Sequence, residues 1–226
     1  MLQIDKKNLF NILKELLPDN PIIIEGGAFI GNDTLRMAKT WPDGTIYAFE
    51  PIPEIFNHLY HNTKDYQNIY PIQLALGTQN GPSLFWPAQN PKKNRSPSQA
   101  GSLLPPKERL TWSDITFSEP IEIPTVTLAS WVKEQQIDNI DFLWLDLQGY
   151  ELPVMQASKS LIQQIPFIYT EVHFIEAYQG QAQYTEIKKW LESIGFTMIA
   201  KDFPEQPDWF FGNALFSKNR DRFLFE

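Results

Sequence analysis

Residues 22–34 read IIIEGGAFIGNDT and decide the fold class. Three consecutive isoleucines predict a short buried strand, because β-branched residues favour extended backbone. Glu25, Gly26 and Gly27 follow, and Gly31 stands where an apolar pattern with helical spacing begins. Glycines at such a turn let a ligand approach the backbone and let the helix pack closely on its strand. The carboxylate adds an acceptor for a ligand's amine or hydroxyl groups. The alternative is a strand–turn–helix with permissive glycines that binds no ligand.

Strands and helices are predicted to alternate along the rest of the chain. Apolar or β-branched runs predict strands at residues 45–50, 68–76, 83–86, 121–126, 140–147, 167–172, 196–200 and 209–216. Apolar residues with helical spacing predict helices near residues 8–17, 33–40, 53–60, 128–136, 151–163 and 183–193. This alternation indicates an α/β fold with a doubly wound, mostly parallel sheet, in which ligands bind at the carboxyl ends of the strands. The short separation of the last two strands suits an antiparallel hairpin.

Residues 87–120 interrupt this pattern. They contain six prolines and no clear strand or helix period. A loop of this length inside a compact domain is usually functional or disordered. We interpret the chain as a single domain of residues 1–226, with an N-terminal helix within residues 1–20 and with residues 87–120 as an insertion or lid on the substrate side. The alternative is a disordered surface excursion.

Composition is that of an ordinary globular protein: of 226 residues, 42% are hydrophobic and 20% are charged. The net charge is −8, with +1 in residues 1–110 and −9 in residues 111–226. An acidic chain argues against nonspecific nucleic-acid binding, which needs basic side chains that neutralise phosphates. The absence of cysteine excludes disulfides, thiolate catalysis and cysteine-ligated zinc. No apolar run reaches the ~18 residues of a membrane span, and we expect a cytoplasmic protein.

Glu50 ends the second predicted strand, 19 residues after Gly31. An acid about 20 residues beyond a glycine turn is placed to bind both ribose hydroxyls of a nucleoside cofactor. It would repel a ribose 2′-phosphate, and this disfavours an NADP-type ligand. The alternative is an ordinary solvated acid that precedes a helix.

The glycine spacing discriminates between cofactors. A dinucleotide fold has the pattern G-x-G-x-x-G, with helix amides facing the pyrophosphate. Glu25, Gly27 and Gly31 instead form E-x-G-x-x-x-G. A carboxylate would repel a pyrophosphate but suits a cationic ligand, and S-adenosylmethionine carries both an ammonium and a sulfonium. The spacing therefore favours a methyl donor over a nicotinamide.

Five blocks of sequence occur in an order that resembles the FkbM family of S-adenosylmethionine-dependent methyltransferases. They read IIIEGGAFIGNDT, IYAFEPIPEIFNHL, LALGTQNG, IDFLWLDLQGYELPVMQAS and YTEVHF, and the resemblance covers roughly residues 21–216. It implies a Rossmann-like class I methyltransferase fold with seven strands, the last of them antiparallel. It also implies O-methylation of a small-molecule acceptor, at a hydroxyl of a sugar, polyketide or related natural product. The cofactor-binding residues that it implies are Glu25, Gly26, Gly27, Phe29, Gly31, Glu50, Pro51, Ala75 and Leu76.

The chain departs from the family pattern at several positions. Glu25 stands where the family usually has Asp, a conservative change, and Phe29 stands where it usually has Asn. Trp144 replaces a usual Lys, and Leu147-Gln148 replaces a usual Val-Glu. Because this chain lacks that Lys and that Glu, it cannot use any role that those side chains have in the family. The change leaves room for an altered substrate.

Methyl transfer to a hydroxyl needs a proton acceptor, and two predicted strand tips supply one. His173 is the leading candidate, because a free imidazole titrates near neutral pH. Asp146, at the tip of the neighbouring strand, is the second. Asp146, Glu171 and His173 could also converge on a divalent cation, although we expect no metal site. A structural role is the alternative for each candidate base.

Two further functions stay open from the sequence alone. The altered WLDLQG block is compatible with a non-catalytic module that keeps the fold, and the glycine turn is compatible with a nicotinamide-dependent oxidoreductase. Aromatic residues on the predicted acceptor side can stack on a substrate or serve only packing. They are Trp86, Trp112, Tyr150, Phe174 and Tyr178.

Overall fold

The computed structural model describes residues 2–93, 96–112, 114–205 and 209–218. Its central element is an eight-stranded sheet in the order β1-β12-β13-β11-β10-β2-β3-β4. In that order the strands are Leu2–Gln3, Thr197–Lys201, Phe211–Ser217, Phe167–His173, Phe142–Leu145, Ile22–Gly26, Thr45–Phe49 and Ile69–Ile72. The strand order reverses between β2 and β10, the kind of place where open α/β sheets bind ligands.

Neighbouring strands of this sheet run parallel except at β13, which is antiparallel to both β11 and β12. The prediction of a doubly wound, mostly parallel sheet whose last strand is antiparallel is therefore confirmed. The sheet has one strand more than the seven predicted, because β1 pairs with Ala200 and Lys201 at its edge. A strand of two residues is too short to show a period in the sequence.

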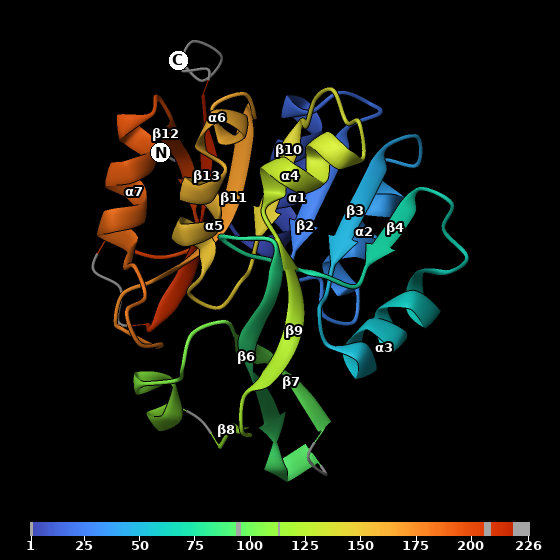
Figure 1. Ribbon diagram of the computed structural model, residues 1–226. Helices are drawn as coiled ribbons and strands as arrows, with labels where there is room; N and C mark the ends of the chain where they lie inside the picture. The colour runs from blue at the N-terminus through green and yellow to red at the C-terminus, as the bar shows by residue number, and fades with distance from the viewer. Residues whose placement is uncertain (1, 94–95, 113, 206–208, 219–226) are drawn as a thin grey trace.

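Helices cover both faces of the sheet, with α1 and α2 behind it and α4 to α7 in front (Figure 1). They are α1 (Lys6–Leu16), α2 (Asn32–Thr40), α3 (Pro53–Thr63), α4 (Leu128–Glu134), α5 (Glu151–Ala157), α6 (Lys159–Ile162) and α7 (Tyr184–Ser193). Ile23 belongs to the core under α1 and α2, and Ile24 to the core under α4 to α7. Neighbouring residues of a strand point to opposite faces, which explains why the buried strands read as unbroken apolar runs. No helix in the described part of the chain is long and apolar enough to cross a membrane.

The N-terminal helix α1 covers one face of the sheet. Leu9 and Leu13 are buried one helical turn apart on one side of the helix, and Leu17, directly after its end, is buried as well. Next to them, the ring of Phe10 lies 6.2 Å from that of Trp144. Trp144 is 5% exposed, so the residue that stands where the resemblance implies Lys is mainly a core residue under α1.

Residues 75–126 contain a second sheet, drawn below the carboxyl ends of the central strands in Figure 1. Its strands lie in the order β5 (Ala75–Leu76), β9 (Ile121–Val126), β6 (Gly81–Asn90) and β7 (Ser96–Ser102), and β8 (Thr116–Phe117) also pairs with β6. Two 3-10 helices, η1 (Pro91–Lys93) and η2 (Glu108–Thr111), complete this segment. The strand predicted at residues 68–76 is in fact two strands, β4 and β5, which belong to different sheets.

The absence of regular structure predicted for residues 87–120 is wrong, because β6 and β7 form a hairpin there. The prolines are the reason for the error. Pro87 stands where the pairing shifts register between Trp86 and Ala88, and Pro97 faces Gln89 within the pair. Prolines are tolerated at bulges and strand edges, so a proline-rich stretch can still be a strand pair.

Candidate active site

A pocket of about 240 Å³ lies between the carboxyl ends of β2, β3 and β10 and the β6–β7 hairpin. The predicted site residues that line it are Glu25, Gly27, Phe29, Glu50, Pro51, Ala75, Leu76 and Asp146. Gly26, Gly31, Glu171 and His173 do not line it. The hairpin contributes one wall, with Phe85, Pro87, Ala88, Gln89, Pro97, Ser98, Gln99, Gly101 and Leu103. The pocket thus joins the predicted cofactor residues to one of the two candidate bases.

Gly27 brings three strand ends together. It adopts φ 85°, and a Cβ built on it would lie 1.9 Å from the carbonyl oxygen of Asp146. Its amide and that of Ala28 both donate to the carbonyl of Phe49, at 3.1 and 2.9 Å. Only glycine permits both this left-handed backbone and this close approach.

The other two glycines of the turn support it from outside the pocket. A Cβ on Gly31 would lie 2.8 Å from a methyl group of Leu59, so this glycine lets α2 pack against α3. A Cβ on Gly26 would lie 3.0–3.1 Å from the leucine side chains of the neighbouring strand ends. Both residues therefore serve packing in the structure.

Glu25 stands at the end of β2 with 2% of its surface exposed. Thr34 Oγ1, in the first turn of α2, donates to Glu25 Oε2 at 2.5 Å. The carboxylate lies beside a helix N-terminus, where the helix dipole favours an anion. Its orientation is therefore set before any ligand enters.

Phe29 adopts φ 52°, a left-handed conformation. This region is open to glycine and is several-fold enriched in asparagine, but it is disfavoured for bulky side chains. The Asn that the family usually has at this position fits this backbone. Phe29 holds it under strain and contributes an aromatic ring to the pocket wall.

Glu50 follows β3 and is buried with 6% exposure. The amide of Ile52 donates to Glu50 Oε1 at 2.9 Å. Burial raises the pKa of this carboxyl to about 8, and the backbone hydrogen bonds oppose that rise only in part. A ligand that offers hydroxyl donors would stabilise the ionised form.

The described charged residues that line the pocket are all acidic. Its acidic lining residues are Glu25, Asp33, Glu50, Glu54 and Asp146. Among the described residues, no lysine, arginine or histidine lines it. Such a pocket attracts a cationic ligand and repels an anionic one, since charges in a cleft of low dielectric are weakly screened.

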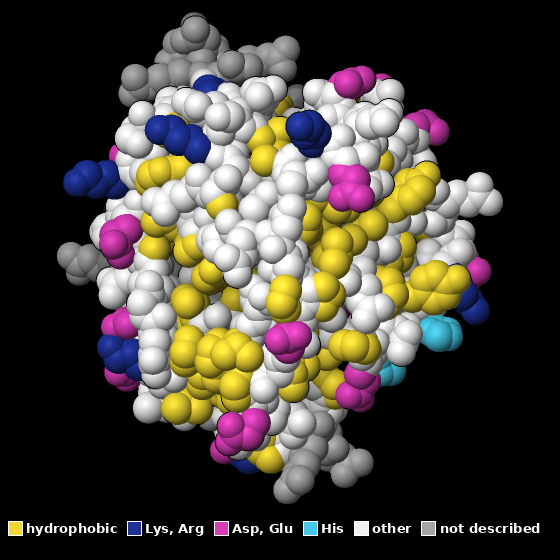
Figure 2. All heavy atoms as spheres, in the orientation of Figure 1, with side chains coloured by type: hydrophobic (Ala, Val, Ile, Leu, Met, Phe, Trp, Pro, Cys, Tyr) yellow, Lys and Arg dark blue, Asp and Glu magenta, His cyan; other side chains and the backbone are white. Residues whose placement is uncertain are grey.

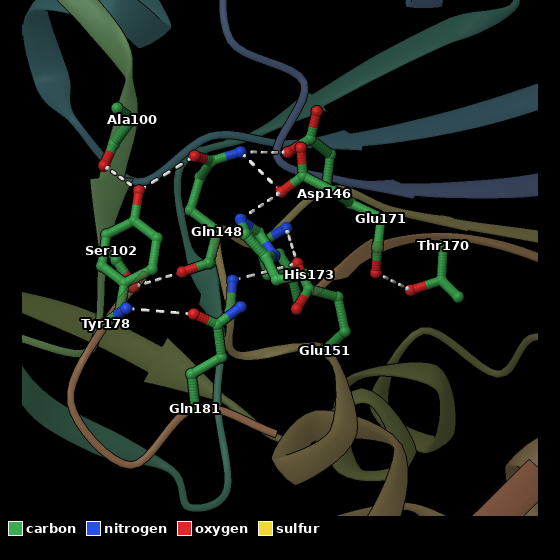
Figure 3. A network of polar contacts seen from close by, with 12 residues as sticks. Ala100, Ser102, Asp146, Gln148, Glu151, Thr170, Glu171, His173, Tyr178 and Gln181 are labelled. Carbon is green, nitrogen blue, oxygen red and sulfur yellow. Dashed lines mark hydrogen bonds and ion pairs between the residues drawn. The ribbon is translucent and has the colours of Figure 1, made fainter. Parts of the chain in front are cut away.

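A second group of polar side chains lies behind Asp146 (Figure 3). Gln148 Nε2 donates to Asp146 Oδ1 at 2.7 Å and to Glu171 Oε2 at 2.9 Å. Glu151, at the start of α5, accepts from the amides of Leu147 and Gly149 at 2.8 and 3.2 Å. Three carboxyl groups therefore share one buried region.

Burial governs the ionisation of this buried group. The pKa of Glu171 lies well above its usual value, first through burial and then through Asp146 and Glu151. The pKa of Glu151 rises to about 7, mainly through burial, against the amides that hydrogen-bond to it. Arg109 lies near enough to oppose the rise at Glu171. The region therefore resists holding all its carboxyls in the ionised form.

His173 lies at the end of β11, away from the pocket. It is 1% exposed and is enclosed by the rings of Trp112, Phe211 and Tyr178, whose centroids lie 5.9–6.1 Å from its own. Its Nε2 is 3.7 Å from Glu171 Oε2, and its Nδ1 has no hydrogen-bond partner within the described chain. Burial, reinforced by Arg109, lowers the pKa of the imidazole to about 3. This environment favours a neutral histidine and does not suit a base that works near neutral pH.

The divalent-cation alternative finds no support in the geometry. Within the described ranges, no group of three or more His, Asp or Glu side chains is arranged to hold a metal ion. The amide of Gln148 lies between Asp146 and Glu171 and donates to both. An N–H donor in this position occupies the place that a cation would need.

Hydrophobic side chains gather near η2, at the lower left of Figure 2. The ring of Trp112 stacks on Phe210 at a centroid distance of 4.4 Å, and Arg109 lies 5.3 Å from the Trp112 ring. Leu110, Trp209, Phe210 and Phe211 are between 44% and 61% exposed. The inner side of this stack is what buries His173.

The sequence did not single out Arg109 or the bridging role of Gln148. Tyr178, considered there for stacking or packing, has its hydroxyl 3.0 Å from Gln148 Oε1 and 2.8 Å from the carbonyl of Ala100. It also receives a hydrogen bond from Arg109. The one available signal was Gln148, where the family usually has Glu.

Two curated relatives are methyltransferases. The chain is 29% identical over 194 residues to the 2-O-methyltransferase NoeI of Sinorhizobium fredii, covering 85% of this chain and 79% of that protein. It is 20% identical over 169 residues to the hexuronic acid methyltransferase AglP of Haloferax volcanii, covering 74% of this chain and 62% of that protein.

Solved structures share the fold. A methyltransferase FkbM from Methylobacillus flagellatus matches with a TM-score of 0.55 at 15% identity, over 90% of this chain and 45% of that chain. The magnesium protoporphyrin IX methyltransferase of Synechocystis PCC 6803, with bound S-adenosylmethionine, matches with a TM-score of 0.54 at 10% identity, over 94% and 76% of the two chains. At these identities the likeness establishes a class I methyltransferase fold.

A family model, the methyltransferase FkbM domain, matches residues 25–198. This range begins at the acid of the glycine turn and contains all the pocket residues. The matches confirm the resemblance and support neither the oxidoreductase nor the non-catalytic alternative. The acidic pocket is also suited to a cationic donor. The chain belongs to the FkbM methyltransferase family and is an S-adenosylmethionine-dependent methyltransferase.

Proposed function

We propose that the protein transfers a methyl group to a hydroxyl of an uncharged sugar, or of a sugar-like part of a natural product, with Asp146 as the proton acceptor. One observation carries this proposal: a single pocket runs from Glu25 and Glu50, past Asp146, to a hairpin wall without charged residues among those described. The name of one relative, a 2-O-methyltransferase, favours transfer to oxygen, and that of another, a hexuronic acid methyltransferase, favours a sugar-like acceptor.

The donor end of the pocket is built from Glu25, Glu50 and the Gly27 turn. S-adenosylmethionine, when bound, supplies an electrophilic methyl group on a sulfonium. Glu25 would bind the ammonium of this donor, and Glu50 would accept hydrogen bonds from its ribose hydroxyls. Pro51, Ala75 and Leu76 offer apolar surface beside Glu50. The backbone of residues 27–29 leaves room for close approach.

The acceptor end of the pocket is the hairpin wall. Phe85, Pro87, Ala88 and Leu103 are apolar, and Gln89, Ser98 and Gln99 are uncharged hydrogen-bonding groups. An acidic acceptor would bring a negative charge toward Asp146 with no described cation in the lining. At a separation of 8 Å and an effective dielectric constant of 20, one such pair costs about 2 kcal/mol. We therefore infer an uncharged acceptor.

Asp146 is a better candidate base than His173. Asp146 lines the pocket, whereas His173 lies behind Glu171 with its pKa lowered by burial. A base must come within hydrogen-bond reach of the proton it removes, and of these two residues only Asp146 meets this condition for a molecule in the pocket. Asp146 accepts the hydroxyl proton as the new C–O bond forms and the methyl–sulfur bond breaks.

A transfer assay with methyl-labelled S-adenosylmethionine tests the proposal. The acceptors are matched pairs of methyl glycosides, each offered as the neutral sugar and as its uronic acid. We expect kcat/KM for the neutral member to exceed that of the acid at least ~30-fold, which corresponds to about 2 kcal/mol. Asp146→Asn should lower kcat about 10²–10⁴-fold.

Calorimetry supplies the control for this assay. Adenosylhomocysteine should bind to Asp146→Asn as it does to the unchanged protein, which separates loss of chemistry from loss of the donor site. Transfer to the uronic acids alone would exclude an uncharged acceptor. Full turnover by Asp146→Asn would exclude Asp146 as the base.

A further inference from the structure

Gln148 stands at the centre of the buried polar group behind the pocket (Figure 3). Its backbone has φ 52°, a conformation that costs a non-glycine residue free energy. The hydroxyl of Ser102, from β7, donates to its carbonyl oxygen at 2.8 Å and holds that backbone in place. Its side chain is buried with 7% exposure. A strained residue that is anchored from a distant strand suggests a role for its side chain.

The partners of the amide define its orientation. Nε2 faces two carboxylates, and both of its hydrogens are used, toward Asp146 at 2.7 Å and Glu171 at 2.9 Å. Oε1 faces the hydroxyl of Tyr178 at 3.0 Å. The reversed amide would turn its oxygen toward carboxyl oxygens of Asp146 and Glu171 and would give up both N–H donations, which is unfavourable. The side-chain amide therefore donates two hydrogen bonds through Nε2, while its Oε1 accepts one from Tyr178.

Charged and titratable groups surround this bridge on every side. Glu171 and His173 come from β11, Glu151 from α5, Tyr178 from the loop after β11 and Arg109 from η2. The carboxyls outnumber the one arginine. A donor between Asp146 and Glu171 lowers their mutual repulsion and favours the ionised form of the group that faces the pocket.

We propose that Gln148 is a positioning residue that orients the carboxylate of Asp146 toward the pocket and keeps it ionised beside Glu171. The proposal rests on the base role of Asp146 proposed above. It also gives a reason for the departure from the family's usual Glu. A glutamate could bridge two carboxylates only while protonated, and then with a single hydrogen, whereas the amide donates two hydrogens at any pH.

The test is the titration of Asp146, followed by carbon-13 NMR of its side-chain carboxyl and assigned with Asp146→Asn. Gln148→Met keeps the length of the side chain and removes both donors. We expect it to raise the titration midpoint of Asp146 by about one pH unit or more, a tenfold change in its ionisation constant. Adenosylhomocysteine affinity should change by less than about threefold, because Gln148 does not line the pocket.

Two other variants complete the design. Tyr178→Phe removes the hydrogen bond to Oε1 but leaves both carboxylate bonds, and it should move the Asp146 midpoint by less than ~0.3 unit. Gln148→Glu, the family's usual residue, also lacks the permanent donors and should raise the midpoint. It replaces Gln148→Met in the test if the methionine variant fails to fold.

The outcomes separate this inference from the proposed function. An unchanged Asp146 midpoint in a folded Gln148 variant overturns the positioning role. If the midpoint rises while Asp146→Asn keeps full turnover, the bridge stands and the base role fails. If both proposals hold, the acid limb of the kcat profile moves to higher pH in Gln148→Met by the same amount as the midpoint.

Discussion

The turn after β2, called the donor turn, and the turn after β10, called the acceptor turn because it carries Asp146, lie side by side at one end of the pocket. Each holds a non-glycine residue at φ 52°. In the donor turn this residue is Phe29, two residues after Gly27. In the acceptor turn it is Gln148, followed by Gly149 at φ 95°. The two turns have similar backbone strain but differ in what holds them.

The donor turn is held by the backbone, since the amides of Gly27 and Ala28 both donate to the carbonyl of Phe49. The acceptor turn is held by side chains, with Ser102 on the carbonyl of Gln148 and Glu151 on the amides around it. A ligand site made from backbone depends on glycines close in sequence. A site made from side chains depends on residues up to 46 positions apart. We therefore expect the donor side of the site to be shared by methyltransferases that act on different acceptors. The acceptor side should be particular to this chain.

The largest effect should come from breaking the donor turn with Gly27→Ala. The new Cβ would meet the carbonyl oxygen of Asp146 at 1.9 Å, in a backbone that also has φ 85°. Since that oxygen belongs to the backbone of the acceptor turn, relief requires both turns to move. We expect a loss of more than about 4 kcal/mol in the free energy of unfolding, measured by chemical denaturation.

Gly180→Ala is the matched control for this prediction. Gly180 has φ 73°, but a Cβ there meets nothing within 4 Å. It should cost only about 1 kcal/mol, the backbone penalty without the clash. Equal losses for the two variants would show that the contact between the turns carries no stability.

The second effect concerns Glu50, whose pKa burial raises to about 8. A ligand that donates hydroxyl hydrogens favours the ionised carboxylate, so adenosylhomocysteine should bind about tenfold more tightly at pH 9 than at pH 7. Glu50→Gln should weaken binding about 10–100-fold and remove this pH dependence, since charge-assisted hydrogen bonds are lost. Calorimetry across this pH range checks both. Glu54→Gln, also in the pocket lining, should keep the pH dependence.

The same raised pKa predicts how stability depends on pH. The folded carboxyl binds its proton more tightly than the unfolded one, with its ordinary value of 4.5. Its contribution to stability is therefore full below pH 4.5 and is lost as pH rises through 8. In thermal melts without ligand, the melting temperature of Glu50→Gln should fall less between pH 4.5 and pH 8 than that of the unchanged protein. An identical decline in both proteins would place the raised pKa elsewhere, with Glu151 the next candidate.

The sequence predicted the sheet well because parallel strands buried on both faces leave apolar runs, such as residues 22–24 and 142–145. It placed a strand at residues 83–86, within β6, but it failed for the rest of β6 and for β7, where the pairing accommodates Pro87 at a bulge and Pro97 opposite Gln89. Tolerance of proline depends on which backbone groups face a partner, and this is a property of the folded pairing. It also failed to show that residues 75–76 leave the central sheet.

The sequence predicted the donor side of the candidate site better than the identity of the base. Glu25, Gly27 and Glu50 were predicted from their spacing, because strand tips of a doubly wound sheet meet at one edge. His173 was predicted by the same rule, yet the structure places it away from the pocket. Its burial depends on Trp112 and Phe211, from segments far apart in the chain, whose stacking leaves no local signal. Distant side chains decide the environment of an acid or a base, and local spacing does not.

The smallest predicted effect is a gain from Phe29→Asn, which places the family's usual residue in the donor turn. Asparagine enters the left-handed region several-fold more readily than most residues, which corresponds to about 0.5–1 kcal/mol of added stability. Phe29 lines the pocket and is no part of the hydrophobic cores, so little packing is lost. Gln136→Asn, at φ 55° on the surface after α4, should gain as much if backbone strain is the cause. A gain at Gln136 with a loss at Phe29, in denaturation without ligand, would show that the phenyl ring stabilises the empty pocket by more than its backbone strain costs.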